Sequence, residues 1–556
     1  MNFMKKKFFI PVVLSILLAG VFSCNDDPSK GDDPEGPQLT SAEASALVNS
    51  AYLPLQWLSS YYTVFGEGAT ETLASISDDV ASAGDISRLD FDEYNDVVIE
   101  LFDDPYISIG TANLAIAQIE ASPVNTDLTQ AHKDHLIARA KFIRAHEYFK
   151  LVQAFGEIPL ILDEASALGR ERASIDAVYT QIVKDLTEAA THLPEYDATK
   201  SNPSQGAVNA ILAKVYLTWG QKPLSQEQLQ AIANTKSDPA AVAPDAAKLE
   251  KAIEYANKVI NSGKYKLLSN YNKIWGSVNE NNDEVIFSVR HDGDGIDGDA
   301  GGMGNHQTHC GYTWPGDPLK DPHLSYTDIT LENRIPSNND SRKLFSYVTS
   351  ITFDDGAVDN LTWPVSVVRN GKWIHRTSYD GPDYIASKTQ PNDIDRIEYR
   401  YAEVLLIKAE ALLFLNRSSE ALTVVNQIRQ RAFGGHYENE GKLTTLTKED
   451  LYKEWDYELA FEQKHWYNLV RWKNYVSTIE NAVSNFEYYK DKYASAGSIK
   501  EAFPGVANIN APFYVKLHDN QRAKLNNLKG KFYRLPIPAT NYEGEALNIT
   551  PQNPGY

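Results

Sequence analysis

Apolar residues that recur at alternating steps of three and four positions limit most strongly how this chain can fold. Ala138, Phe142, Ala145, Phe149 and Val152 share one helix face at this spacing. Five later segments repeat it, at Ile175, Val178, Ile182 and Leu186; Val208, Ile211, Val215 and Trp219; Leu249, Ile253, Ala256 and Ile260; Ala402, Leu405, Ala409 and Leu412; and Ala421, Val424 and Ile428. The pattern predicts a mainly α protein whose helix pairs stack like tetratricopeptide repeats, although no repeat of about 34 residues is present.

One helix boundary can also be predicted from the sequence. Ser174 stands directly before the apolar pattern that begins at Ile175, which is the position of an N-capping side chain, and Pro194 follows the end of the pattern.

Residues 283–396 lose the helical spacing. Residues 284–289 have the pattern of a strand, and glycine, proline, asparagine and tryptophan follow without helical period. We therefore expect one domain over 39–556, with a helical scaffold over about 39–282 and 397–475. A loop-rich insertion with a few short strands would occupy about 283–396, and an irregular segment 476–556. Binding residues commonly lie on loops that a rigid scaffold positions, so we expect the site in the insertion.

The first 23 residues have the form of an export signal. Lys5, Lys6 and Lys7 precede an apolar run over 8–22, shorter than the ~20 residues that a membrane-spanning helix needs. Residues 17–24 resemble a bacterial lipobox, so we expect Cys24 to be lipidated and to become the mature N-terminus. Residues 24–38 lack large apolar side chains and are expected to form a flexible tether. The alternative is an ordinary signal peptide with an incidental cysteine.

Charge and cysteine content narrow the classes of function. The net charge of −21 leaves no basic stripe to neutralise phosphates, which argues against nucleic acid and against electrostatic adhesion to anionic lipid. The 31 tyrosines, 20 phenylalanines and 9 tryptophans suit carbohydrate or peptide binding, although such residues also fill helical cores. With Cys24 lipidated, Cys310 has no partner, so the core must stabilise the mature chain without a disulfide.

Several segments resemble, in order, the landmarks of one known family. They are residues 139–149 with 155–160, then 258–265, 282–287, 400–406, 426–432, 535–538 and 552–556. Together they are similar to the SusD/RagB family of outer-membrane nutrient-binding lipoproteins of the Bacteroidetes. Residues 454–472 depart from the family pattern by lacking an arginine and a glycine, but Glu458, Glu462 and Arg471 are present. We interpret these three as an ion-pair network inside the helix bundle.

The resemblance implies a function at the cell surface. Such proteins capture an oligosaccharide or a peptide outside the cell and deliver it to a SusC-like TonB-dependent transporter, without catalysing a reaction. The expected location is the outer membrane, facing the exterior and held by the lipid on Cys24. Glycan capture is the main hypothesis, oligopeptide uptake on the same scaffold is the alternative, and a secreted glycoside hydrolase is the third. The sequence contains no catalytic motif that would favour the hydrolase.

The candidate ligand site combines two loops. The resemblance to starch-binding relatives implies an aromatic platform built from an early loop and from the loop after the central strand. The later loop contains Tyr312, Trp314 and Asp317 among glycine and proline, and the early loop follows Asp78 and Asp79. Aromatic faces pack against the C–H bonds of sugars while nearby carboxylates bind hydroxyls. The early loop has no tryptophan or tyrosine over 80–90, so the ligand is not required to be starch.

Two segments carry residue types that ligate metals. Asp292, Asp294, Asp297 and Asp299 alternate with glycine and could surround a calcium ion, although the spacing is not that of an EF-hand. The alternative is a solvated acidic loop. His306, His309 and Cys310 have the chemistry of zinc ligands but no second ligand cluster, so we interpret them as polar loop residues. No cofactor is expected beyond this possible structural calcium.

Overall fold

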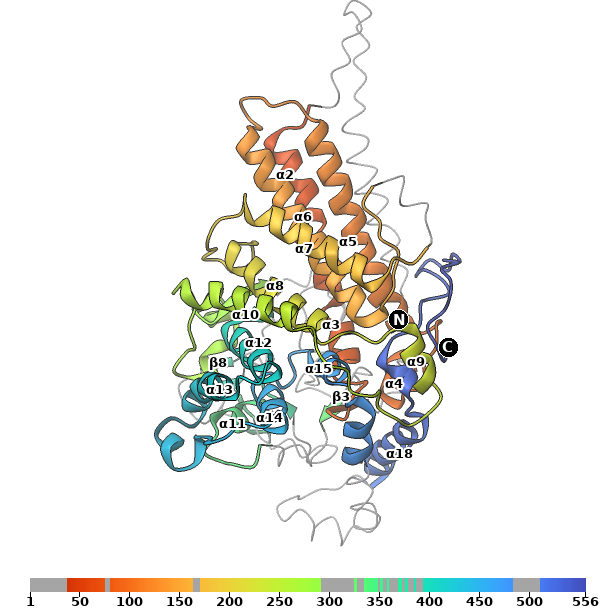
Figure 1. Cartoon of the computed structure of the whole chain (residues 1–556), viewed down its shortest axis with the longest axis vertical. Helices are drawn as coiled ribbons and strands as arrows, with labels where there is room; N and C mark the ends of the chain where they lie inside the picture. Colours follow the sequence, from red (N-terminus) through yellow and green to blue (C-terminus); the bar gives the residue numbers. More distant parts are fainter. Residues whose placement is uncertain are drawn as a thin grey trace, which may run out of the picture.

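A computed structural model describes residues 38–75, 81–163, 171–291, 325–327, 335–348, 351–353, 358–359, 369–372, 376–378, 385–386, 394–483 and 511–556. These residues form a mainly helical protein with a few short strands, which confirms the predicted fold class. Figure 1 shows the helices following one another through the molecule in layers.

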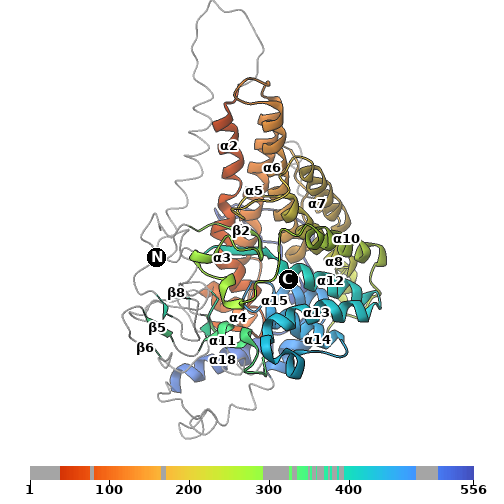
Figure 2. The same cartoon turned by 90° about the vertical axis from the view of Figure 1, so that its left-hand side faces the viewer.

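The N-terminal part is entirely helical apart from one short strand. Its helices are α2 (Ser41–Ser50), α3 (Leu53–Gly66), α4 (Ala81–Arg88), α5 (Asp96–Ala121), α6 (Gln130–Phe155), α7 (Ile175–Ala190), α8 (Gln205–Gly220), α9 (Gln226–Ile232) and α10 (Ala246–Asn261). The two longest, α5 and α6, have 26 residues each and pack side by side. With α2 they extend to one end of the molecule (Figures 1 and 2).

Side-chain caps explain where the scaffold helices begin. The Ser174 side chain accepts a hydrogen bond from the N–H of Ala177 at the start of α7, as the sequence predicted. Ser204 caps α8 in the same way, and Asp245 caps α10. Each cap satisfies a backbone N–H that has no partner inside the helix, which stabilises the helix start by about 1 kcal/mol.

The predicted apolar faces form the core. Every position of the α6 face is buried, whereas Trp219 on α8 and Ile260 on α10 are partly exposed. These faces join one hydrophobic cluster because α5 packs on α6, α6 on α7, α7 on α8, and α8 on α10. The chain continues this pattern when α10 packs on α12 (Tyr401–Phe414) and α12 on α13 (Ser418–Phe433). Successive helices therefore stack on one another as repeat units do.

Further α-helices are α11 (Ser341–Ser346), α14 (Lys448–Glu458), α15 (His465–Trp472) and α18 (Ala511–Asn527), and residues 475–483 are helical as well. The prediction that residues 476–556 are irregular is wrong for α18, which has 17 residues. This helix packs against α4 and β1 (Leu73–Ser75), from the opposite end of the sequence. Its partners are thus more than 400 positions away, which a local pattern of residues does not reveal.

Nine of the ten labelled strands lie between residues 285 and 400. They are β2 (Val285–Val289), β3 (Ser325–Thr327), β4 (Tyr347–Val348), β5 (Ile351–Phe353), β6 (Val358–Asp359), β7 (Arg369–Asn370), β8 (Arg376–Ser378), β9 (Ile385–Ala386) and β10 (Arg396–Arg400). A four-stranded sheet has the order β6-β5-β9-β8, in which β5 and β9 are parallel. The buried β2 confirms the predicted strand, and it pairs antiparallel with the equally buried β10. The loop-rich segment therefore leaves and rejoins the scaffold at one place.

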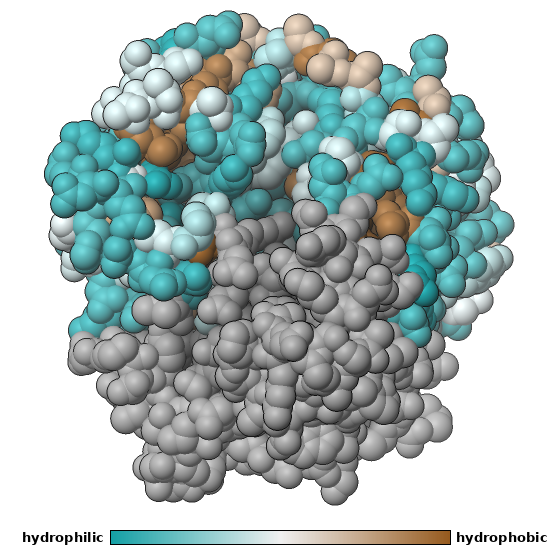
Figure 3. All heavy atoms as spheres, turned by 90° about the horizontal axis from the view of Figure 1, so that it is seen from below, coloured by the Kyte–Doolittle hydropathy of each residue, from teal (hydrophilic) through white to brown (hydrophobic). Residues whose placement is uncertain are grey.

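On the face of the molecule opposite α2, the described residues are mainly hydrophilic. In Figure 3, hydrophobic colour appears on the described residues as separate small spots. Within the described ranges, no helix combines the length and the apolar character that a bilayer crossing requires.

Candidate functional site

The residues predicted to bind a ligand or a metal all lie outside the described residues. This applies to Asp78, Asp79, Tyr312, Trp314, Asp317, Asp292, Asp294, Asp297, Asp299, His306, His309 and Cys310, and also to the lipidation site Cys24. Their roles stay predictions, and the described residues next to them in the chain give the geometry around the predicted site.

A short strand pair joins the two segments that lead to the predicted ligand residues. β1 pairs antiparallel with β3, with Leu73 opposite Thr327 and Ser75 opposite Ser325. Asp78 follows Ser75 by three positions, and Asp317 precedes Ser325 by eight. The strand pair thus joins the segment that precedes the first predicted loop to the segment that follows the second.

The turn before β1 is held by a buried lysine from α18. The Lys524 ammonium is fully buried and donates to the backbone carbonyl oxygens of Gly68, at 3.0 Å, Leu73, at 3.2 Å, and Thr70. An ammonium group has three N–H donors, so these carbonyls use all of them. Lys524 therefore determines the path of the chain into β1, from a helix that the sequence did not predict.

The other side of the same turn is held by the segment before α15. One Glu67 carboxylate oxygen accepts the backbone N–H of Gln463 at 3.0 Å, and the other accepts the Thr72 hydroxyl at 2.7 Å. Glu67 is almost fully buried. Two charge-assisted hydrogen bonds to one buried carboxylate make this contact a strong one.

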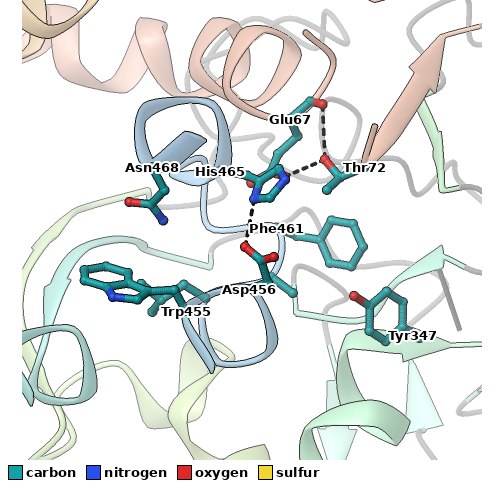
Figure 4. Close-up of a pocket in the computed structure, with 10 residues that line it drawn as sticks. Glu67, Thr72, Tyr347, Trp455, Asp456, Phe461, His465 and Asn468 are labelled. Carbon is teal, nitrogen blue, oxygen red and sulfur yellow. Dashed lines mark hydrogen bonds and ion pairs between the residues drawn. The ribbon is translucent and has the colours of Figure 1, made fainter. Parts of the chain in front are cut away.

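A small cavity lies beside this turn, and His465 lies in its wall (Figure 4). His465 contacts Glu71 Oε1 through Nε2 at 2.9 Å, and its Nδ1 lies 3.0 Å from Asp456 Oδ1. The histidine thereby links α14 to the turn before β1. The cavity has a volume of about 10 Å³, room for about one water molecule and not for a sugar ring. We therefore assign it a supporting role for the ligand loops.

A buried ion-pair network lies behind this region. Arg400, at the junction of β10 and α12, contacts Glu284 at 2.9 Å, Glu458 at 2.6 Å and Glu462 at 2.8 Å, and all four side chains are fully buried. Burial acts to raise the pKa of Glu458, but Arg431, Arg400 and Arg342 together hold it well below its usual value. The network ties the base of the insertion to α14 because β10, the residue directly before β2, and α14 each supply a charge.

The predicted network of Glu458, Glu462 and Arg471 is only partly correct. Glu458 and Glu462 share Arg400, whereas Arg471 forms a separate bidentate pair with Glu410 on α12, at 2.9 Å for both contacts. Helix α15 thus presents Arg471 to α12 of the scaffold. The three residues are close in sequence but belong to two ionic clusters.

Sequence reasoning missed Lys524, His465 and Arg400 as residues that position the site. Apart from the contact of His465 with Asp456, their contacts connect residues 58 to 456 positions apart, and a charged residue is ordinarily predicted to lie on the surface. The family landmark at residues 400–406 contains Arg400 and is the one sequence signal that pointed to it. Among the described residues, no group of three or more His, Cys, Asp or Glu side chains is placed to hold a metal ion.

The stacked helices and the insertion that returns to them define a helical-repeat scaffold interrupted by a loop-rich segment. Two family models match the chain: "SusD family" over residues 296–556 and "Starch-binding associating with outer membrane" over residues 40–217. The chain belongs to the SusD family, as its landmarks indicated.

Comparisons with individual relatives are consistent with this family membership. The chain is 29% identical over 510 residues to SusD-like protein P2 of Formosa agariphila, covering 84% of this chain and 91% of the relative. Among solved structures, a SusD homolog from Bacteroides thetaiotaomicron superposes with a TM-score of 0.69 at 20% identity, covering 93% of this chain and 97% of the other. A laminarin-binding SusD-like protein superposes with a TM-score of 0.63 at 20% identity, covering 93% and 99%. At these identities the structures establish the shared fold.

Proposed function

We propose that this protein captures a glycan at the outer face of the outer membrane and passes it, unchanged, to a SusC-like TonB-dependent transporter. Family membership supports the proposal, because one matching family model describes starch-binding proteins that associate with the outer membrane. A relative of the same fold binds laminarin, which is also a glucan. The lipid on Cys24 would provide the anchor.

The pairing of β1 with β3 is the observation that carries the proposal. It joins the segment before Asp78 and Asp79 to the segment after Tyr312, Trp314 and Asp317. A sugar site needs aromatic faces and polar groups close together, so that the ring packs on one and its hydroxyls bind the other. The strand pair provides a physical reason for these groups to meet, although they are far apart in sequence.

The buried carboxylates of the ion-pair network are not a glycosidase pair. Glu458 and Glu462 are enclosed by Arg400, Arg431 and Arg342, so they contact cations and no solvent. A glycosidase places two carboxyl groups about 5–9.5 Å apart on either side of a sugar. These carboxylates are not accessible to a sugar and serve the fold.

The test is a screen of the purified protein against glycan and peptide libraries, followed by titration calorimetry of the best ligand. Trp314→Ala should weaken glycan binding about tenfold or more, because aromatic stacking contributes ~1–3 kcal/mol and ~1.4 kcal/mol is one decade of affinity. The matched control is Tyr94→Ala, which removes an aromatic side chain that is 62% exposed in the loop before α5. The control should keep the affinity of the unmodified protein.

Four outcomes would contradict parts of the proposal. Binding to peptides and to no glycan would favour the oligopeptide alternative. Reproducible cleavage of a bound glycan, lost on replacing a single carboxylate, would favour the hydrolase. A Trp314→Ala protein with unchanged affinity and a lowered melting temperature would make Trp314 a packing residue. Membrane fractionation tests the anchor, since Cys24→Ser should release the protein, and retention of that variant would refute lipidation at Cys24.

A further inference from the structure

A second cavity lies on the helical scaffold, formed by side chains that the proposed glycan site does not use. It is bounded by α6, α7, the end of α8, α15 and the chain before the C-terminus, through Val152, Gln153, Tyr179, Thr218, Gln221, Lys222, Pro223, Leu224, Tyr467, Val470, Arg471, Lys473, Tyr533 and Arg534. Its volume is about 40 Å³, which corresponds to roughly three water molecules at about 10–15 Å³ each. A small polar group fits this space and a whole sugar ring does not.

The cavity is lined by positive charge in a strongly acidic protein. Four of its side chains are cationic and none is a carboxylate, although the chain has a net charge of −21. Glu410 neutralises Arg471, whereas Glu157 lies within ion-pair distance of both Arg534, at 2.9 Å, and Arg172, at 3.4 Å. Arg534 and Arg172 therefore share the single Glu157 carboxylate, and the cavity wall keeps a surplus of positive charge.

The two lysines add to this surplus. Lys473 donates a hydrogen bond to the backbone carbonyl of Gln221 at 2.7 Å, and Lys222 is exposed at the rim. Within the described part of the chain, neither lysine forms an ion pair with a carboxylate. Burial, together with the nearby Lys222, lowers the pKa of Lys473 to about 8. A negative charge placed close to this ammonium would stabilise its protonated form.

A buried hydroxyl in the wall has no hydrogen-bond partner. Tyr179 is fully buried, and its Oη contacts no hydrogen-bonding atom of the described residues. Burial raises the pKa of this phenol well above its usual value, and Arg471 and Arg534 act in the opposite direction. The ring stacks on Trp219, with 5.3 Å between ring centroids and 8° between planes, so its direction is fixed. An unsatisfied buried donor costs about 1–3 kcal/mol, and a bound acceptor would remove this cost.

The backbone at Gly156 leaves room for the Arg534 side chain. Gly156 ends α6 with a φ of +77°, and a Cβ at this position would collide with the Arg534 guanidinium. Arg534 can therefore lie against the backbone and reach Glu157 and the cavity wall. The site is formed by rigid elements and does not depend on the loops of the insertion.

We propose that this cavity binds a single oxyanion group, with the Tyr179 hydroxyl donating to it and Lys473 and Lys222 supplying the charge. The shared chemistry is that of a carboxylate, a sulfate or a phosphate, either as a free anion or as the acid group of a sugar. The assignment does not rest on the proposed glycan function, because it uses none of the predicted glycan-binding residues.

The experiment is titration calorimetry of the purified mature protein at constant ionic strength, buffered below the pKa of Lys473. The probes are inorganic sulfate, inorganic phosphate, glucuronate and, as the neutral control, glucose. We expect saturable binding of at least one anion and none of glucose. Binding of glucuronate would identify the acid group of a sugar as the ligand, and binding of sulfate or phosphate alone would identify a free tetrahedral anion.

Two variants test the assigned roles. Tyr179→Phe removes only the hydroxyl and should keep the fold, yet lower anion affinity about tenfold, as expected for a hydrogen bond to a charged group. Lys473→Gln should lower it by a similar factor. Lys264→Gln, which removes an exposed lysine outside the cavity, should have no effect. Absence of saturable anion binding would overturn the proposal, as would an anion affinity in Tyr179→Phe and Lys473→Gln that is unchanged from that of the unmodified protein. Trp314→Ala should leave the anion affinity unchanged, so this site and the glycan site can fail independently.

Discussion

Asp103 is a carboxylic acid that the fold keeps away from water. It lies in α5 with 8% of its surface exposed, and its Oδ2 accepts the backbone N–H of Tyr542 at 2.7 Å. Burial raises the pKa of Asp103 from 3.8 to about 7, opposed by this hydrogen bond and assisted by Glu100 and Glu543. The folded protein therefore binds a proton at Asp103 over a pH range in which the unfolded chain has lost it.

The sign of the pH effect follows from this difference. Where the folded state binds more protons than the unfolded state, the free energy of unfolding decreases as the pH rises. For Asp103 this range runs from about pH 4 to about pH 7, with a slope of up to about 1.4 kcal/mol per pH unit. The whole interval corresponds to an upper limit of about 4 kcal/mol. Asp103→Asn keeps the shape and an acceptor oxygen for Tyr542 but removes the ionisation.

We expect Asp103→Asn to be more stable than the unmodified protein, by an amount that grows between about pH 4 and about pH 7. Urea denaturation at several pH values measures this. The matched control is Asp92→Asn, since Asp92 also accepts one backbone N–H, from Tyr94 at 2.9 Å, but is exposed. The control should show no pH-dependent gain. A stability difference for Asp103→Asn that stays constant with pH, or that shrinks as the pH rises, would refute the reasoning.

Two further predictions concern buried cations. Arg400→Met should lower the free energy of unfolding by about 3–5 kcal/mol, because it leaves buried carboxylates without their shared partner. Urea denaturation measures this loss, with Arg417→Ala as the control. Arg417 pairs with Glu420 at the surface and should contribute less than about 1 kcal/mol. Similar losses of stability in both variants would contradict the importance of the buried network. Lys524→Met should destabilise the protein by about 3 kcal/mol, because it leaves buried carbonyls without a donor, and calorimetry should also show weaker glycan binding. Lys529→Met, at an exposed position five residues later, should change neither the free energy of unfolding nor the glycan affinity. If Lys524→Met kept full glycan affinity, Lys524 would have no part in positioning the site.

The helices and their buried faces could be predicted from the residues alone. The positions Phe142 and Phe149 on α6, or Leu405 and Leu412 on α12, are buried because an α-helix returns to the same face every three to four residues. Ser174 begins α7 because a side-chain oxygen just before a helix can satisfy a free N–H. Both effects act over a few residues of chain, so a single sequence contains all the information they require.

The partners of the charged residues were decided by the tertiary structure. Arg400 meets Glu284, Glu458 and Glu462 across separations of 58 to 116 positions, and Lys524 meets the turn before β1 across more than 450. A buried charge is stable only where other groups converge on it, and that convergence is a property of the packed helices. The same holds for β1 and β3, which pair across about 250 positions while α18 packs against β1. Local periodicity therefore determined which elements form, and long-range electrostatics and packing determined which distant segments lie side by side.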